Sequence, residues 1–287
     1  MDGHSKVIRK LPVFVNKVIK ISPLHGGITN ASFKITAGSK NYVARFGFAL
    51  NKHLGTNRRQ EFFNSRIAAS LGIGPKIVAL VPKYDLLLAE YIEGQPLTEK
   101  SVRYKGSIKK IAEILRKLHR GKNFKGRFDI YKICQKYLTR ELSTGSQFKP
   151  EATTLLKDLL SIKSKLGNLP HDAQCHLDLA YTNIISSKDG LKIIDWEYSA
   201  NSYHMLDLAI LSAVSDFNYF HDKYLLRAYG EKVLDREKFK MLKALALIRE
   251  IGWDMLQVRY SKINFNYKKF TRDNLRKYRL ISKGLFS

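Results

Sequence analysis

The stretch that decides the fold reads His176-Leu177-Asp178-Leu179-Ala180-Tyr181-Thr182-Asn183, and the apolar run 191–194 then leads into Asp195. Asp178 and Asn183 lie in one short loop, so both side chains can turn into the same cleft. Transfer of a phosphoryl group needs magnesium ligands and one carboxylate that orients the attacking hydroxyl. Carboxylate and amide oxygens are hard ligands that suit magnesium. Asp178, Asn183 and Asp195 therefore predict a phosphoryl-transfer site.

The composition indicates one compact, folded unit with a basic surface. The chain has 287 residues, of which 44% are hydrophobic, and 51 Lys and Arg against 25 Asp and Glu give a net charge of +26. Such a charge attracts nucleotide phosphates, nucleic acid or anionic membranes. The basic residues are spread along the chain without a recognition motif, which favours a solvated surface over a specific nucleic-acid interface. Weak contact with an anionic membrane surface stays open, and the oligomeric state is not indicated.

The cysteines and the apolar runs favour a cytoplasmic protein. Cys134 and Cys175 are far apart and have no CxxC spacing, which argues against a disulfide framework or a zinc site. The apolar run 11–15 is too short for a signal peptide core or a membrane span. We therefore expect a soluble protein in a reducing compartment.

The pattern along the chain predicts an α+β fold with two lobes. Short β-prone runs at 18–21, 31–35, 41–46, 77–80 and 84–91 indicate an antiparallel sheet. One helix, 57–71, interrupts them and ends at Gly72. After Gly94 the period becomes helical, with apolar faces at 108–118, 151–166, 204–220 and 236–261. We expect an N-terminal nucleotide-binding lobe over residues 1–92 and a mainly helical lobe over 93–287.

The decisive loop sits in a break within the helical lobe. The runs 183–185 and 191–194 are short and β-prone, and Asp189-Gly190 between them is a good hairpin turn. We expect a rigid hairpin that carries the loop. His176 is interpreted as a buried imidazole that holds the loop backbone, and Cys175 as a small core residue.

Seven motifs occur in the order found in one family of kinase-like enzymes. They are Gly26-Gly27-Ile28-Thr29-Asn30, Tyr42-Val43-Ala44-Arg45, Glu61 on a helix, Gly72-Ile73-Gly74-Pro75, Glu90-Tyr91-Ile92-Glu93-Gly94, the HxDxxxxN loop, and Ile194-Asp195-Trp196-Glu197-Tyr198. Together they cover nearly the whole chain. The sequence resembles the phosphotransferases that include choline and ethanolamine kinases, thiamine kinases and aminoglycoside phosphotransferases. The resemblance implies a bilobal protein-kinase-like fold that uses ATP and Mg²⁺.

The resemblance also implies a role for each matching position. Asp178 would be the catalytic base, while Asn183 and Asp195 would hold magnesium. The implied nucleotide contacts are Gly27, Thr29, Asn30, Arg45, Glu61, Glu90 and Ile92. Arg45 stands where protein kinases have a lysine, and its permanent charge and forked guanidinium suit phosphate oxygens. Thr182 stands where most relatives have glycine.

The acceptor is expected to be a small amino alcohol, most closely choline or ethanolamine. The candidate substrate contacts are Trp196, Glu197, Tyr198 and Trp253, because aromatic faces attract a quaternary ammonium. Thiamine is an alternative, since thiamine kinases share the Asp-Trp-Glu-Tyr run. An aminoglycoside fits less well, because the helices after residue 204 carry few acids. The alternative without catalysis is a kinase-like module that binds nucleotides or nucleic acid.

Overall fold

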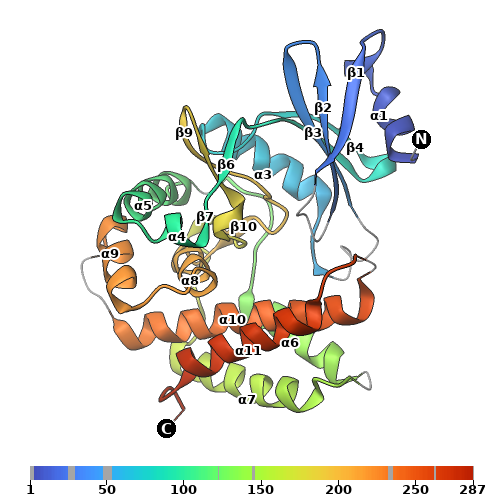
Figure 1. Cartoon of the computed structure of the whole chain (residues 1–287). Helices are drawn as coiled ribbons and strands as arrows, with labels where there is room; N and C mark the ends of the chain where they lie inside the picture. The colour runs from blue at the N-terminus through green and yellow to red at the C-terminus, as the bar shows by residue number, and fades with distance from the viewer. Residues whose placement is uncertain are drawn as a thin grey trace.

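A small β-rich part and a larger helical part make up the molecule (Figure 1). The computed structural model describes residues 3–24, 30–47, 54–121, 123–143, 146–231, 235–261 and 263–286. Gly27 and Thr29, two predicted nucleotide contacts, lie outside the described residues. The expected α+β class is confirmed.

The N-terminal sheet is antiparallel and has the strand order β1-β2-β3-β5-β4. Its strands are β1 (Ile19–Leu24), β2 (Asn30–Ala37), β3 (Lys40–Gly47), β4 (Ile77–Val81) and β5 (Leu86–Glu90). The helix α1 (Gly3–Arg9) adds Ile8 to the apolar cluster on one face, with Ile35 and Leu88 from the sheet. All five predicted strands are confirmed, with boundaries shifted by a few residues.

Helix α3 (Arg58–Ser70) lies between the sheet and the helical part (Figure 1). It begins at Asn57, whose side chain accepts the N–H groups of Arg59 and Gln60, as an N-cap does. Further along, the amide nitrogens of Gln60 and Asn64 donate to the carbonyl of Ser199 at 2.9 and 2.8 Å. The predicted helix 57–71 is confirmed, and it is bonded to the second part of the chain.

Three short strands form the base on which the decisive loop sits. β6 (Gly94–Pro96) pairs with β8 (Ile184–Ser187), and β8 pairs with β9 (Gly190–Ile193), which confirms the predicted hairpin. The N–H of Ile193 also donates to the carbonyl of Ile73 at 2.8 Å, which joins this hairpin to the segment after α3. The division into lobes at residue 92 stays a prediction.

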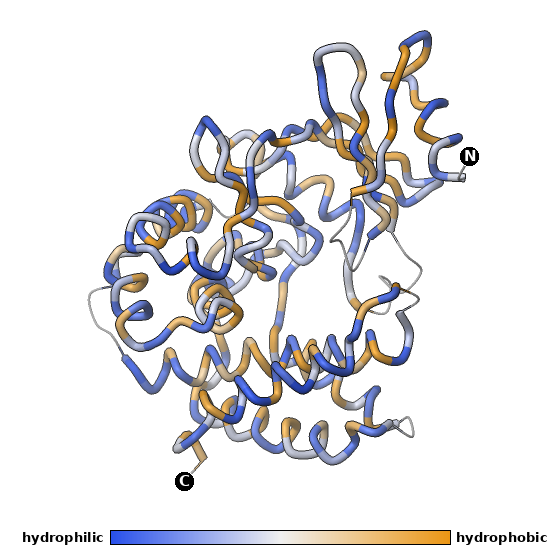
Figure 2. The backbone as a smooth tube through the Cα atoms, in the orientation of Figure 1, coloured by the Kyte–Doolittle hydropathy of each residue, from blue (hydrophilic) through white to orange (hydrophobic). Residues whose placement is uncertain are grey.

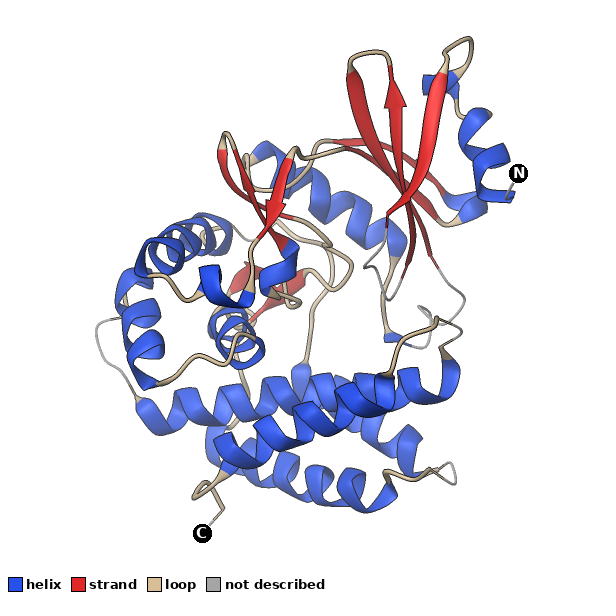
Figure 3. Ribbon diagram, viewed as in Figure 1, coloured by secondary structure: helices blue, strands red, loops and turns tan. Residues whose placement is uncertain are grey.

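Helices dominate the rest of the described chain (Figure 3). They are α4 (Glu99–Val102), α5 (Lys105–His119), α6 (Ile130–Leu142), α7 (Lys149–Leu166), α8 (Met205–Val214), α9 (Tyr219–Tyr229), α10 (Arg236–Tyr260) and α11 (Tyr267–Ser282). The predicted stretch 204–220 is wrong as a single helix. It breaks after Val214 because the side chain of Asn218 caps a new helix, α9. The short strands β7 (Ala173–Cys175) and β10 (Ala200–Ser202) pair beneath the loop.

Helix α10 runs through the helical core, packed against α6, α8 and α11 (Figure 1). In Figure 2 α11 is mostly hydrophilic, while hydrophobic segments recur along α10. That contrast fits their burial, since α10 buries residues on all sides and α11 buries one stripe. None of the described helices combines the length and the apolar character that crossing a bilayer requires.

Candidate active site

The loop that carries Asp178 is fixed from below by Asp207. This fully buried carboxylate accepts the backbone N–H groups of His176 and Leu177 at 2.8 and 2.7 Å, and Nε2 of His119 lies 3.0 Å away. Burial would raise the pKa of Asp207, but these hydrogen bonds and the neighbouring histidines lower it overall. Asp207 on α8 thus stabilises the loop conformation as an ionised group.

His176 holds the loop to the following strand. It is fully buried, and its Nε2 lies 2.9 Å from the carbonyl oxygen of Ile194, while Nδ1 faces the N–H of Asp178 at 3.3 Å. A proton on Nε2 would serve the contact with Ile194, and the buried ring joins the loop backbone to the next strand, as predicted. The ring also packs edge-on against Trp196, whose side chain is 1% exposed and whose Nε1 donates to Ile193.

Asp178 and Asn183 face each other across the turn of the loop. Nδ2 of Asn183 donates to the carbonyl of Asp178 at 3.0 Å and lies 3.5 Å from Oδ2 of the same residue. This use of the amide nitrogen leaves the amide oxygen of Asn183 as the atom that could bind a cation. Oδ1 of Asp178 accepts from Nη1 of Arg249 at 3.1 Å. Asp178 is therefore oriented on one oxygen and less constrained on the other.

Asp195 follows β9 and has a backbone φ of 65°. Few residues other than glycine adopt this left-handed conformation, although aspartate tolerates it better than most. The N–H of Ile194 donates to the carbonyl of Asn183 at 2.9 Å. The backbones of the two predicted metal ligands, Asn183 and Asp195, are therefore close together at the open end of the hairpin. An amide oxygen and a carboxylate at these points are a donor pair that fits Mg²⁺.

Arg45 on β3 faces this hairpin from the sheet. Its Nη2 is 2.5 Å from Oδ1 of Asp195, and its Nη1 is 2.8 Å from Oε1 of Glu61 on α3. Burial lowers the pKa of Arg45, but Asp195, Glu61 and Glu197 outweigh it and raise the pKa above its ordinary value. The predicted Arg45–Glu61 pair is present, and a permanent cation stands beside the predicted metal site.

A second arginine extends this network towards the first strands. Nη1 of Arg58 lies 2.6 Å from Oε2 of Glu61, and its Nη2 donates to Oδ1 of Asn30 at 2.7 Å. Nδ2 of Asn30 in turn donates to Oε2 of Glu197 at 2.9 Å. Burial, the charge of Asp195 and other neighbours raise the pKa of Glu197 to about 8. Glu197, predicted to contact the acceptor, thus lies on the side of Arg45 and Asn30.

Glu90 and Ile92, two predicted nucleotide contacts, lie at the end of β5 and just after it. The N–H of Glu90 donates to Lys76 at 2.8 Å, and the N–H of Tyr91 donates to Asn41 at 2.9 Å. Ile92 comes next and is partly exposed. The structure thus places Glu90 and Ile92 at the passage from the sheet into the helical part.

On the other side of Asp178, helix α10 presents charged residues in an otherwise apolar sequence. Arg249 is 2% exposed, its guanidinium lies 4.4 Å from the centroid of the Tyr198 ring, and its Nη1 is 3.5 Å from Oε2 of Glu250. Trp253, a predicted substrate contact, is buried nearby on the same helix and packs against Tyr267 at 6.2 Å between ring centroids. An ion pair between the buried Arg249 and the partly exposed Asp178 thus joins the loop to α10.

Comparison with known families decides between the kinase-like groups. A family model described as choline/ethanolamine kinase matches residues 21–239, most of the chain. The chain belongs to the choline/ethanolamine kinase family. This is a family of small-molecule phosphotransferases, so the resemblance predicted from the motifs is confirmed.

Relatives of this family are distant in sequence and similar in fold. Protein LicA of Haemophilus influenzae is 25% identical over 209 residues, which are 71% of this chain and 61% of that protein. Ethanolamine kinase 2 of Rattus norvegicus is 23% identical, with 94% of this chain and 78% of the relative covered. The crystal structure of choline kinase LicA from Streptococcus pneumoniae superimposes with a TM-score of 0.83 at 25% identity, over 99% of each chain. A spectinomycin phosphotransferase shares the fold at a TM-score of 0.65 and 14% identity, over 99% of this chain and 97% of its own.

Two residues of this family member were missed by sequence reasoning, Arg249 and Glu250. No motif marks them, and they lie far from Asp178 along the chain. The available signal was their setting, since adjacent charges interrupt the apolar run of a long helix. Buried charges in such a run are expected to be paired, and this pair leads to the active-site loop.

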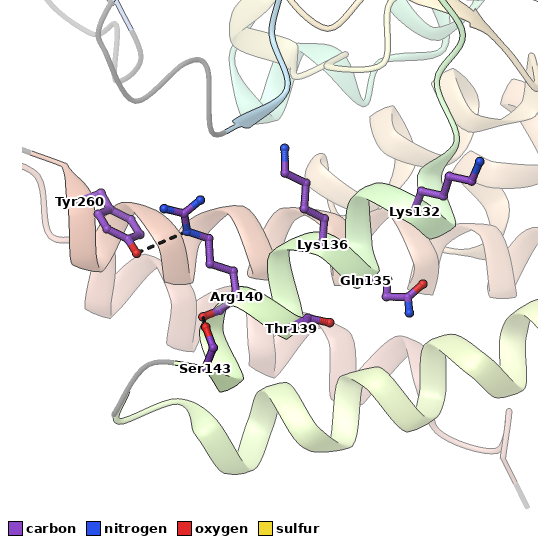
Figure 4. Close-up of a pocket in the computed structure, with 7 residues that line it drawn as sticks. All are labelled: Lys132, Gln135, Lys136, Thr139, Arg140, Ser143 and Tyr260. Atoms are coloured by element: carbon purple, nitrogen blue, oxygen red, sulfur yellow. Dashed lines mark hydrogen bonds between the residues drawn. The ribbon is translucent and has the colours of Figure 1, made fainter.

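Away from this site, a shallow groove of about 750 Å³ runs between α6 and the end of α10 (Figure 4). Its lining consists of Lys132, Gln135, Lys136, Thr139, Arg140, Ser143 and Tyr260. Its three cations are four residues apart on α6 and so share one face. Arg140 also lies over the Tyr260 ring, 5.0 Å from its centroid. The groove is basic. That the protein has no specific nucleic-acid partner, and that it contacts an anionic membrane weakly, both stay predictions.

Proposed function

We propose that this family member transfers the γ-phosphoryl group of ATP to the hydroxyl of a small amino alcohol, choline or ethanolamine. The observation that supports the proposal is the arrangement around the β8–β9 hairpin, where Asn183 bonds to Asp178 and Asp195 lies against Arg45. A carboxylate base, two hard metal ligands and a cation beside the phosphates are the parts that phosphoryl transfer needs.

In this proposal the sheet side binds the nucleotide. Arg45, aligned by Glu61, would contact phosphate oxygens, and Asn30 would stand beside it at the start of β2. Glu90 and Ile92 would face the adenine, while Gly27 and Thr29 would belong to the loop over the phosphates. The buried Glu61 would keep the guanidinium in place while Asp195 holds Mg²⁺.

Asn183 and Asp195 would hold Mg²⁺. The bound ion would neutralise charge on the phosphate oxygens. The residues fit this task because the amide nitrogen of Asn183 is occupied inside the loop, which leaves its oxygen available. Asp195 brings a carboxylate whose Oδ1 contacts the guanidinium of Arg45.

On the helical side Asp178 would receive the hydroxyl proton of the acceptor. Arg249 holds Oδ1 at 3.1 Å, so Oδ2 is the oxygen better placed to accept that proton. Trp253 on α10 and Tyr198 after Asp195 are buried, and they would pack behind the acceptor rather than present open ring faces to it. We leave Trp196 out of the proposed contacts, because its indole is buried between His176 and Phe124.

The test is an ADP-release assay with Mg²⁺ and ATP over choline, ethanolamine, thiamine and an aminoglycoside. We expect turnover that depends on choline or ethanolamine. Turnover only with thiamine or the aminoglycoside would reassign the acceptor. No turnover above the rate without acceptor, in a preparation that binds ATP, would favour the binding-module alternative.

A further inference from the structure

The acceptor side of Asp178 carries more carboxylates than cations. Nη1 of Arg249 lies 3.1 Å from Asp178 and 3.5 Å from Glu250, so the two acids are neighbours across one nitrogen atom. One turn further along α10, Asp254 is fully buried and accepts from Asn274 at 2.8 Å. Lys277 on α11 also acts on Glu250, but it is 2.9 Å from Asp216. The cluster thus holds more carboxyl groups than cations.

Two kinds of observation show that this cluster is incompletely satisfied. Burial and the charge of Asp178, opposed by Arg249, raise the pKa of Glu250 to about 7. Independently, three buried atoms on the same helix have no hydrogen-bond partner among the described residues: Nε of Arg249, Nε1 of Trp253 and Oδ1 of Asp254. Buried polar atoms without partners are rare and point to a missing polar ligand or water. The two N–H groups need an acceptor such as water, whereas a cation with hydrogen-bond donors would suit the carboxyl groups.

The nearby aromatic rings offer few open faces to a quaternary ammonium. The Tyr198 ring is already covered by the Arg249 guanidinium at 4.4 Å. Trp196 is 1% exposed and Trp253 is 4% exposed. Phe265 is exposed, but its described partners are Tyr267 and Phe270. Beside Asp178, the accessible recognition group is therefore the Glu250 carboxylate, whose side chain is 23% exposed.

We propose that Glu250, positioned by Arg249, accepts a hydrogen bond from the ammonium group of the acceptor, so that this protein prefers amino alcohols that retain an N–H. The inference rests on the proposed function. In such an acceptor two carbons separate hydroxyl and nitrogen, a spacing that suits two neighbouring carboxylates, Asp178 for the hydroxyl and Glu250 for the N–H. A trimethylated nitrogen has no N–H to donate.

The experiment is a methylation series: ethanolamine, N-methylethanolamine, N,N-dimethylethanolamine and choline, each at neutral pH. The first three ammonium ions keep at least one N–H. We therefore expect kcat/KM to change little until the last step and to fall there by about 10- to 100-fold, the range for one charge-assisted hydrogen bond. This series uses the unmodified protein, so it needs no variant that folds.

In Glu250→Gln the fall in kcat/KM from N,N-dimethylethanolamine to choline should shrink to less than about threefold. Glu250→Asp should retain part of that fall. The matched control is Glu237→Gln, an exposed acid in the first turn of the same helix, which should leave the series unchanged. Choline turned over as well as its dimethyl analogue would overturn this inference and leave the proposed function standing. No turnover with any of the four would overturn the proposed function itself.

Discussion

Arg249 and Asp178 form an ion pair, with Nη1 3.1 Å from Oδ1, that joins α10 to the active-site loop. The arginine is 2% exposed and lies over the Tyr198 ring, so its position is fixed by packing as well as by charge. A buried guanidinium with a fixed position limits the rotation of the carboxylate it binds. The proposed base is thus oriented by a residue that is remote in sequence.

Removal of the base is the first test of the site. Asp178→Asn should lower kcat by about 100- to 10,000-fold, because the amide cannot accept the hydroxyl proton. The assay is ADP release with the best acceptor. Asp189→Asn, an exposed change at the tip of the same hairpin, should keep normal activity. Near-normal turnover by Asp178→Asn would remove this residue from the mechanism.

The metal assignment predicts a dependence on magnesium that two residues control. EDTA should abolish turnover, and added Mg²⁺ should restore it. Asn183→Ala and Asp195→Asn should each raise the Mg²⁺ concentration for half-maximal rate by about tenfold or more, since each removes one ligand atom. A titration of rate against Mg²⁺ measures this. Unchanged titration curves for both variants would contradict the assignment.

Arg45 should matter for stability as well as for nucleotide binding. Arg45→Met leaves Glu61, Asp195 and Glu197 together without their shared cation. Removing one partner of a buried ion pair costs about 3 to 5 kcal/mol. Urea unfolding followed by circular dichroism measures the free energy of unfolding. Arg45→Lys keeps the charge, so a loss as large as that of Arg45→Met would show that the fork, not the charge, is what matters.

Asp207 should control the shape of the loop without touching substrate. In Asp207→Asn an amide replaces a carboxylate that accepts the N–H groups of His176 and Leu177, so at least one donor loses a charged acceptor. We expect about 2 to 3 kcal/mol of lost stability and a lower kcat. Hydrogen exchange should be faster at the Leu177 amide. Unchanged exchange there would mean that other contacts fix the loop.

The raised pKa of Glu250, about 7, predicts a pH dependence of acceptor binding. As pH rises from about 6 to 8 Glu250 ionises, so KM for a cationic acceptor should fall. KM for ATP serves as the internal reference. Glu250→Gln should remove the trend in acceptor KM, and a trend that persists in this variant would assign it to another group.

The same shift has a consequence for stability. The native state binds the Glu250 proton more tightly than the unfolded chain does. The contribution of Glu250 to the free energy of unfolding should therefore decline as pH rises from about 4.5 to about 7. The groups that face Glu250 are Arg249, Asp178 and Asp254 on or beside α10, and Lys277 on α11. Unfolding of the wild-type protein and of Glu250→Gln at several pH values separates this contribution from the others.

Local patterns predicted the sheet, α3 and the hairpin well. Each is bounded by turn residues, such as Gly72 after α3 and Asp189-Gly190 in the hairpin, and each has a clear apolar period. Helices α6 and α11 were not predicted. α11 is rich in lysine and arginine and buries only a narrow stripe, so its partner surface, not its own composition, makes it a helix.

The candidate site was predictable where motifs carry it and not where packing does. Asp178 and Asn183 lie in the loop just before one hairpin and Asp195 follows its second strand, so their proximity follows from local sequence. Arg249 meets Asp178 only because α10 crosses beneath the loop, a tertiary contact that no spacing encodes. Glu197 is a second example. Its aromatic neighbours in the sequence suggested a contact with the acceptor, but its hydrogen bond to Asn30 directs the side chain towards the sheet.

Two hydrogen bonds join α3 to the carbonyl of Ser199 in the helical part, while Arg58 joins the same helix to Asn30 of the sheet. Arg45 belongs to the sheet and Glu61 to α3, so their ion pair is a contact between the sheet and this helix. A rotation of the sheet against α3 on nucleotide binding would therefore change the length of the Arg45–Glu61 contact. Comparing nucleotide-free and nucleotide-bound crystals would measure that change.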